Sequence, residues 1–186
     1  MHPQLEVIIR EFEAAHNRLR SLAEAVPQGY WAQRPDPSRW SIAERIAHLN
    51  LTSSAYLPHL RDGMAQARGC KGGAPRRYRR DPIGWFLWRG AGPPVRFRVK
   101  TTPPFVPTVA KAPGELIAEF ERLQAAQLAC AREADGLPVD RIKITSPFDA
   151  RLKYNLYACL TILPQHQHRH LGQAEQAWHA LGKRGA

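Results

Sequence analysis

Two histidines near the C-terminus, His166 and His170, have a spacing that suits metal chemistry. If this part of the chain is helical, residues four apart share a face of the helix, about one turn apart. Two imidazole rings on one face can both reach a metal ion at about 2.0–2.1 Å, as in many zinc-binding helices. His168 lies about 200° round the helix from His166 and is predicted to face elsewhere. The spacing therefore indicates two of the ligands of a metal site.

A third ligand must come from another segment, and His48 has the best position for it. It follows Ile42 and Ile46 along the apolar stripe of a second predicted helix, so it is expected to face the interior. Helix bundles build metal sites from side chains that project inward from facing helices, and three protein ligands with one open position are typical of catalytic zinc. The alternatives are a hydrogen-bonded core histidine at position 48 and a chance spacing for the other two.

The elements that must position these histidines follow from the apolar periodicity. Four helices are expected, at residues 3–25, 41–58, 113–134 and 152–181, and the second either ends near Pro58 or bends there and continues toward 65. Ser41 and Glu44 form a capping box at the start of the second helix. Little strand signal exists beyond two short stretches, at 95–100 and 142–145.

These elements predict an all-α fold, a four-helix bundle, in one domain that spans residues 1–186. Short connections would make the first two helices antiparallel neighbours, and likewise the last two. The long connection at 67–112 can cross the whole bundle, which allows a parallel pair between the second and third helices.

The positive charge of the chain is concentrated in that connection. The formal net charge is +11, and residues 67–112 hold eleven Lys or Arg against one acid. Because this segment mixes arginines, including Arg76, Arg77, Arg79 and Arg80, with aromatic residues, nucleic-acid binding is one interpretation. A solvated crossover is another, and binding of an anionic substrate or thiol beside the metal is a third. Three aromatic residues are expected to dock onto the bundle in a short helix or to form a dimer interface: Trp85, Phe86 and Trp88.

Neither a membrane location nor a disulfide framework is expected. No apolar stretch approaches the roughly 18–20 residues that cross a bilayer, and the N-terminus lacks the apolar core of a signal peptide. The three cysteines are widely spaced and form no C-x-x-C motif, so they are expected to be reduced. These features predict a cytoplasmic protein.

Two stretches resemble known motifs of one family. Residues 39–49, RWSIAERIAHL, closely resemble the W-S-x-x-E-x-x-x-H-L segment of the DinB/YfiT-like family. Residues 166–173, HQHRHLGQ, are similar to its second signature, a histidine pair followed by Gly-Gln. The resemblance covers residues 1–60 and 150–178 and leaves 67–112 unmatched.

The resemblance implies a four-helix bundle of up-down-down-up topology, with a long crossover between the second and third helices. It also implies a divalent metal ion, commonly zinc or nickel, on one histidine of the second helix and two of the fourth. By position these are His48, His166 and His170. The activities of the family include hydrolysis and transferase reactions that use low-molecular-weight thiols.

We therefore expect a metal-dependent enzyme, either a thiol-dependent S-transferase or a hydrolase, that acts on a small molecule at this three-histidine site. An open metal position would lower the pKa of a bound thiol or water. The alternatives are a non-catalytic metal-binding bundle, acting as a homodimer, and a nucleic-acid-binding bundle that uses residues 67–112. No catalytic acid or base is assigned, because the capping box explains Glu44 better than a contact with His48, and Gln173 is given no catalytic role.

Overall fold

The computed structural model describes residues 1–92, 101–108 and 110–182. It contains five α-helices: α1 (Pro3–Ala25), α2 (Ile42–Gly69), α3 (Pro82–Ala91), α4 (Pro113–Glu133) and α5 (Leu156–Gly182). Two short 3₁₀ helices, η1 (Gln28–Tyr30) and η2 (Pro103–Phe105), and two strands, β1 (Lys143–Thr145) and β2 (Lys153–Asn155), complete the described elements. The mostly helical fold confirms the predicted all-α class. None of the described helices combines the length and hydropathy needed to cross a bilayer.

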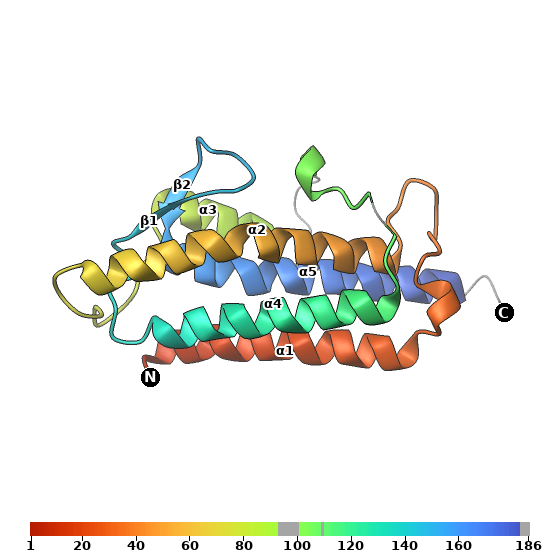
Figure 1. The fold of residues 1–186 in the computed structure, drawn as a ribbon, viewed down its shortest axis with the longest axis horizontal. Helices are drawn as coiled ribbons and strands as arrows, with labels where there is room; N and C mark the ends of the chain where they lie inside the picture. The colour runs from red at the N-terminus through yellow and green to blue at the C-terminus, as the bar shows by residue number, and fades with distance from the viewer. Residues whose placement is uncertain (93–100, 109, 183–186) are drawn as a thin grey trace.

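The four long helices lie side by side, with α3 and the small sheet at one end (Figure 1). The closest packing joins α2 to α4 and α5, and α1 to the same two helices. Within the described residues, the consecutive pairs α1–α2 and α4–α5 make few close contacts. The expectation that consecutive helices are neighbours is therefore wrong. Each connector residue can span up to about 3.3 Å, so the connectors at 26–41 and 134–155 are long enough to reach a helix that is not adjacent.

The start of α2 follows the local sequence signal. The Ser41 side chain accepts a hydrogen bond from the Glu44 amide, and the Glu44 carboxylate accepts one from the Ser41 amide at 2.7 Å. This reciprocal pair satisfies two amide groups that have no partner within the helix, and it confirms the predicted capping box. The helix then continues through Pro58 as far as Gly69, a little beyond the predicted end.

A two-stranded hairpin precedes α5 and delays its start. Strand β1 agrees with the strand expected at 142–145, and it pairs antiparallel with β2, with Ile144 opposite Tyr154. The predicted helix start at 152 is wrong because residues 153–155 belong to that pairing. The Asn155 side chain then accepts a hydrogen bond from the Ala158 amide at 2.8 Å, in the first turn of α5. The strand expected at 95–100 lies outside the described residues.

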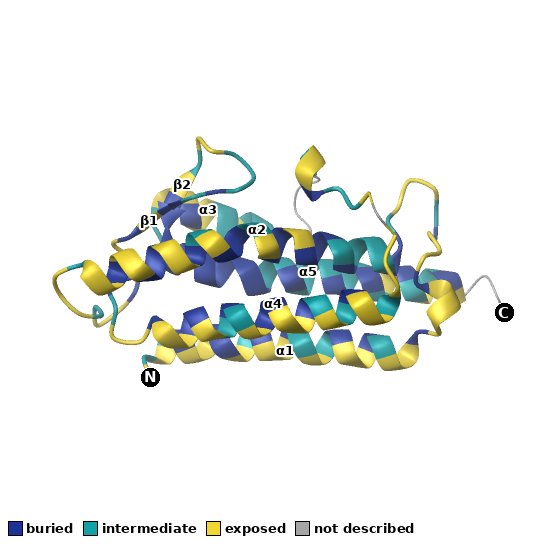
Figure 2. Ribbon diagram, viewed as in Figure 1, coloured by how far each residue is buried: buried dark blue, intermediate teal, exposed yellow. Residues whose placement is uncertain are grey.

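The apolar core has two parts with a polar layer between them. One buried cluster includes Leu5 to Phe12 of α1 and Leu156 to Leu163 of α5, and the other includes Leu19 of α1 and Leu171 of α5. Between them along α5 lie residues 164–170. In this stretch buried Gln167 donates hydrogen bonds to two buried glutamines of α4, Gln124 and Gln127. The outer faces of the helices are largely exposed (Figure 2). The polar middle of the bundle is therefore where the candidate ligands lie.

The cysteines agree with the sequence-based expectation. All three are free, and Cys130 and Cys159 are buried within the first apolar cluster. Burial raises the pKa of the Cys130 thiol. These two residues are therefore core side chains held in the thiol form.

Candidate metal centre

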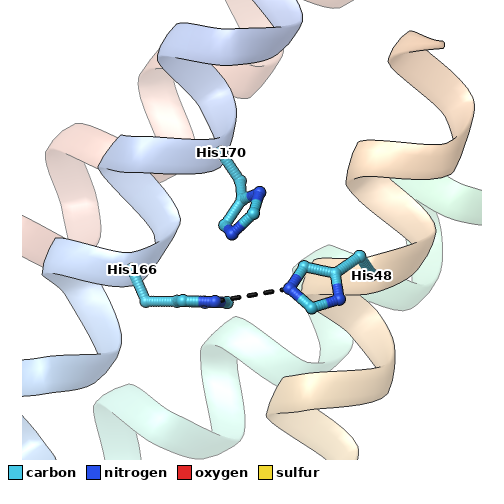
Figure 3. A group of neighbouring side chains, drawn as sticks. All are labelled: His48, His166 and His170. Carbon is cyan, nitrogen blue, oxygen red and sulfur yellow. Dashed lines mark hydrogen bonds between the residues drawn. The ribbon is translucent and has the colours of Figure 1, made fainter. Parts of the chain in front are cut away.

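His48, His166 and His170 lie together where α2 packs against α5. Figure 3 shows the three rings turned toward one another, His48 from α2 and the other two from successive turns of α5. Their candidate ligand atoms all lie within 4.8 Å of one another. The ring centroid of His170 is 4.5 Å from that of each partner, and the other two centroids are 5.2 Å apart. The structure thus brings all three predicted residues into one cluster.

The spacing of the rings fits a divalent metal ion. The Nε2 atoms of His48 and His166 are 3.3 Å apart. Two nitrogens that each lie about 2.0–2.1 Å from a tetrahedral zinc ion are about 3.3 Å from each other. Within the described residues, the buried Nδ1 of His170 has no hydrogen-bond partner, an arrangement that native structures rarely leave unexplained. Imidazole is a good ligand for both zinc and nickel, so the cluster could hold either ion.

The orientation of His48 is set by a backbone carbonyl. Its Nδ1 lies 2.8 Å from the carbonyl oxygen of Phe105, in η2. Because a carbonyl can only accept, Nδ1 carries the proton and Nε2 keeps its lone pair. Metal-binding histidines are usually fixed in this way through their second nitrogen. Sequence reasoning missed Phe105 because a backbone carbonyl has no side-chain signature.

Burial keeps the three rings neutral. It lowers the pKa of His48, lowers that of His166 to about 3, and holds that of His170 well below its usual value of 6.5. Mutual repulsion among the rings and the positive charge of Arg169 add to the effect on His166 and His170. A neutral imidazole offers a lone pair without first losing a proton. At neutral pH the site is therefore ready to bind a cation.

Aromatic side chains line the cluster. The Trp40 ring lies 5.3 Å from that of His48, and the Phe148 ring lies 6.5 Å from that of His166. Phe105 packs on Phe148 with ring centroids 4.0 Å apart. These residues come from the α1–α2 connector, the crossover and the hairpin. Three segments distant in sequence therefore place aromatic rings beside the histidines.

Two neighbouring polar residues, Glu44 and His168, have roles outside the cluster. Glu44 binds the Ser41 amide and the Arg34 guanidinium, which confirms its capping role. The partner of the His48 Nδ1 atom is instead the Phe105 carbonyl. His168 faces α1, where its Nε2 lies 3.1 Å from the Glu11 carbonyl, as the helical spacing predicted. These contacts support the choice of 166 and 170, and not 168, as the inward pair.

The basic crossover does not form one continuous described surface. Three exposed arginines line a shallow cavity of about 760 Å³ beside the start of α1: Arg76, Arg77 and Arg79. Arg80 instead packs over the Trp88 ring at 4.0 Å and donates a hydrogen bond to Thr161. Its role is therefore to hold the crossover against α5. Three further basic residues of the crossover lie outside the described residues: Arg96, Arg98 and Lys100.

The aromatic segment of the crossover forms the expected short helix, α3. This helix packs against α5, with Gly84 close to Ala158. Trp85 and Phe86 nevertheless remain 52% and 67% exposed. Only Trp88 of the three aromatic residues is partly buried against the core. The predicted docking onto the bundle is therefore correct for the helix as a whole but not for these two side chains.

Comparison with known proteins identifies the family. A family model described as the DinB superfamily matches residues 11–174, which include all three histidines. No curated protein and no solved structure gives a significant match. Because the matched region covers most of the chain, the protein belongs to the DinB superfamily.

Proposed function

We propose that this protein is a metal-dependent enzyme that binds one divalent ion, zinc or nickel, through His48, His166 and His170. The main support is the convergence of three neutral imidazoles with a 3.3 Å separation between two of their Nε2 atoms. Three protein ligands leave a coordination position for a substrate. We propose a thiol-dependent S-transferase or a hydrolase, because a bound divalent ion lowers the pKa of a thiol or of water.

In such a reaction the protein itself positions the metal-binding rings and limits the access of water to them. The Phe105 carbonyl holds the His48 ring by its Nδ1 proton. The rings of Trp40 and Phe148 lie beside the histidines, and the Phe105 ring packs on Phe148. Exclusion of water strengthens the electrostatic interactions inside a site and limits side reactions.

We further propose that the four long helices have the up-down-down-up order, within one domain over residues 1–186. The course of the chain in Figure 1 supports this: α1 and α5 run toward one end of the bundle, and α2 and α4 toward the other. A parallel α2–α4 pair requires a long crossover, and residues 70–112 connect these two helices.

The metal content of the purified protein tests the proposal directly. The full chain, prepared with a tag that contains no histidine and without added metal, is expected to carry about one zinc or nickel ion per chain by elemental analysis. Replacement of His48, His166 or His170 by Ala is expected to remove it. His179→Ala is the matched control, because this residue lies on the same helix and is exposed. Absence of metal, with no uptake by the apoprotein, would overturn the proposal.

Two model reactions separate the proposed activities. Transfer of a low-molecular-weight thiol to 1-chloro-2,4-dinitrobenzene, with loss of chloride, reports S-transfer, and release of 4-nitrophenol from its acetate ester reports hydrolysis. Either rate is expected to fall in His170→Ala. Metal binding with neither reaction, across a panel of thiols and esters, would favour the non-catalytic metal-binding alternative.

A further inference from the structure

An arginine lies beside the histidine cluster and joins the two helices that form it. Arg45 is one turn before His48 on α2, and its Nη1 donates a hydrogen bond to the Oε1 atom of Gln173. Gln173 is in turn one turn after His170 on α5. The Arg45–Gln173 bond therefore crosses between α2 and α5 next to the His48–His170 pair.

Within the described residues the Arg45 guanidinium forms no ion pair with a carboxylate, although the nearby charge of Glu44 partly offsets its own. Its buried Nε has no hydrogen-bond partner in this part of the chain. The adjacent acid, Glu44, is bound by Arg34. Burial, and then the positive charge of Arg39, lower the pKa of Arg45 to about 10, so it is still protonated at neutral pH. A partly buried cation without a paired counter-charge is unfavourable unless a ligand supplies one.

A second arginine adds to the positive charge. Arg169, next to His170, donates a hydrogen bond to the Gly90 carbonyl at 2.9 Å. The positive charges of Arg45 and Arg169, after the larger effect of burial, both lower the pKa values of His48 and His170. A divalent ion on three neutral histidines would raise the positive charge further, because none of the ligands is anionic.

We propose that Arg45 is a specificity-determining residue that selects ligands with a carboxylate group. The carboxylate pairs with the guanidinium while the other end of the ligand takes the open metal position, so the inference rests on the proposed metal site. A guanidinium matches the planar carboxylate with two parallel N–H donors. Gln173 holds the group in place through Nη1, and a carboxylate supplies the partner that Nε lacks.

A pair of thiols that differ only in charge tests this role. The full-length protein is loaded with Co²⁺, whose absorption reports thiolate binding, and is titrated with 3-mercaptopropionate and with its neutral amide. We expect the wild-type protein to bind the acid about tenfold more tightly, as is usual for a charge-assisted hydrogen bond. In Arg45→Gln this preference for the acid over the amide is expected to disappear.

Two further variants control for structure and charge. Arg61→Gln makes the same charge change on the same helix, at an exposed position sixteen residues away, and is expected to keep the wild-type preference. Gln173→Leu keeps the charge but removes the acceptor that positions it, and is expected to weaken the preference. It provides a second test should Arg45→Gln fail to fold.

The outcomes separate this inference from the proposed function. The acid can also chelate the metal by itself, so a preference that survives in Arg45→Gln would overturn the role of Arg45. Equal affinities of the wild-type protein for acid and amide would overturn it as well. Absence of cobalt binding would overturn the metal-dependent function and this inference together.

Discussion

His48 and His166 are 118 residues apart in the chain, yet their Nε2 atoms lie 3.3 Å from each other. The Nδ1 atom of His48 donates to Phe105, so the Nε2 atom of His48 presents a lone pair toward His166. Two lone pairs at this distance repel, and either a proton on His166 or a cation between the rings must separate them. The packing of α2 on α5 thus places two ring nitrogens where a shared proton or a metal ion can bridge them.

Metal removal is expected to lower thermal stability. With free metal at a hundred times its Kd, binding adds about 2.7 kcal/mol to the free energy of unfolding. For a chain of this size that corresponds to a Tm higher by about 5–10 °C than in the presence of chelator. Differential scanning fluorimetry measures the shift. His170→Ala is expected to lose it and His179→Ala to keep it, whereas equal shifts in all three proteins would contradict the assigned ligands.

The metal-free protein is expected to lose stability as the pH falls. Burial lowers the pKa of the three histidines in the folded state, to about 3 for His166, from an ordinary value of 6.5. Between these values the unfolded chain binds more protons, so the free energy of unfolding falls with falling pH. Denaturant unfolding in the presence of chelator, between about pH 7 and pH 4, measures the slope. His166→Gln is expected to reduce the slope, and an unchanged slope would argue against a buried neutral ring at this position.

Loosening of η2 is expected to weaken metal binding without removing a ligand. Phe105 is 4% exposed and packs on Phe148, and its carbonyl orients His48. Phe105→Ala is expected to lower metal affinity about 10–100-fold, as loss of such orienting contacts usually does. Phe86→Ala, at a site that is 67% exposed in the same crossover, is the control. Isothermal titration with zinc compares them, and equal affinities would show that the Phe105 side chain does not hold the carbonyl in place.

Two glycines of α3 are expected to respond in opposite ways to the same substitution. A Cβ atom at Gly84 would lie 2.3 Å from the Ala158 Cβ, whereas one at Gly90 would meet nothing within 4 Å. Gly84→Ala is therefore expected to destabilise the protein by about 1–3 kcal/mol through overpacking. Gly90→Ala is expected to stabilise it by about 0.5–1 kcal/mol, because alanine favours helix. Urea unfolding measures the change in the free energy of unfolding of each variant. Similar changes in Gly84→Ala and Gly90→Ala would contradict the close packing of α3 on α5.

Local signals in the sequence predicted the start of α2 and the common orientation of His166 and His170 on α5. The capping box at Ser41 and the apolar periodicity placed the start of α2 within one residue. The spacing of His166 and His170 predicted that both share one face of α5, and the structure agrees (Figure 3). These features depend only on contacts within about one helical turn, so they can be predicted from the sequence alone.

Only the tertiary structure decided which segments meet. Three contacts join residues far apart in the chain. Helix α1 packs against α4 and α5, β2 pairs with β1, and the Phe105 carbonyl lies against His48. The same holds for Arg45 and Gln173, whose hydrogen bond depends on the register of α2 against α5. Such contacts depend on how the apolar faces of several helices pack together. The residue type at a single position does not predict that packing. The sequence by itself therefore determined the helices and the candidate ligands, while the packing of the bundle determined how those ligands face one another.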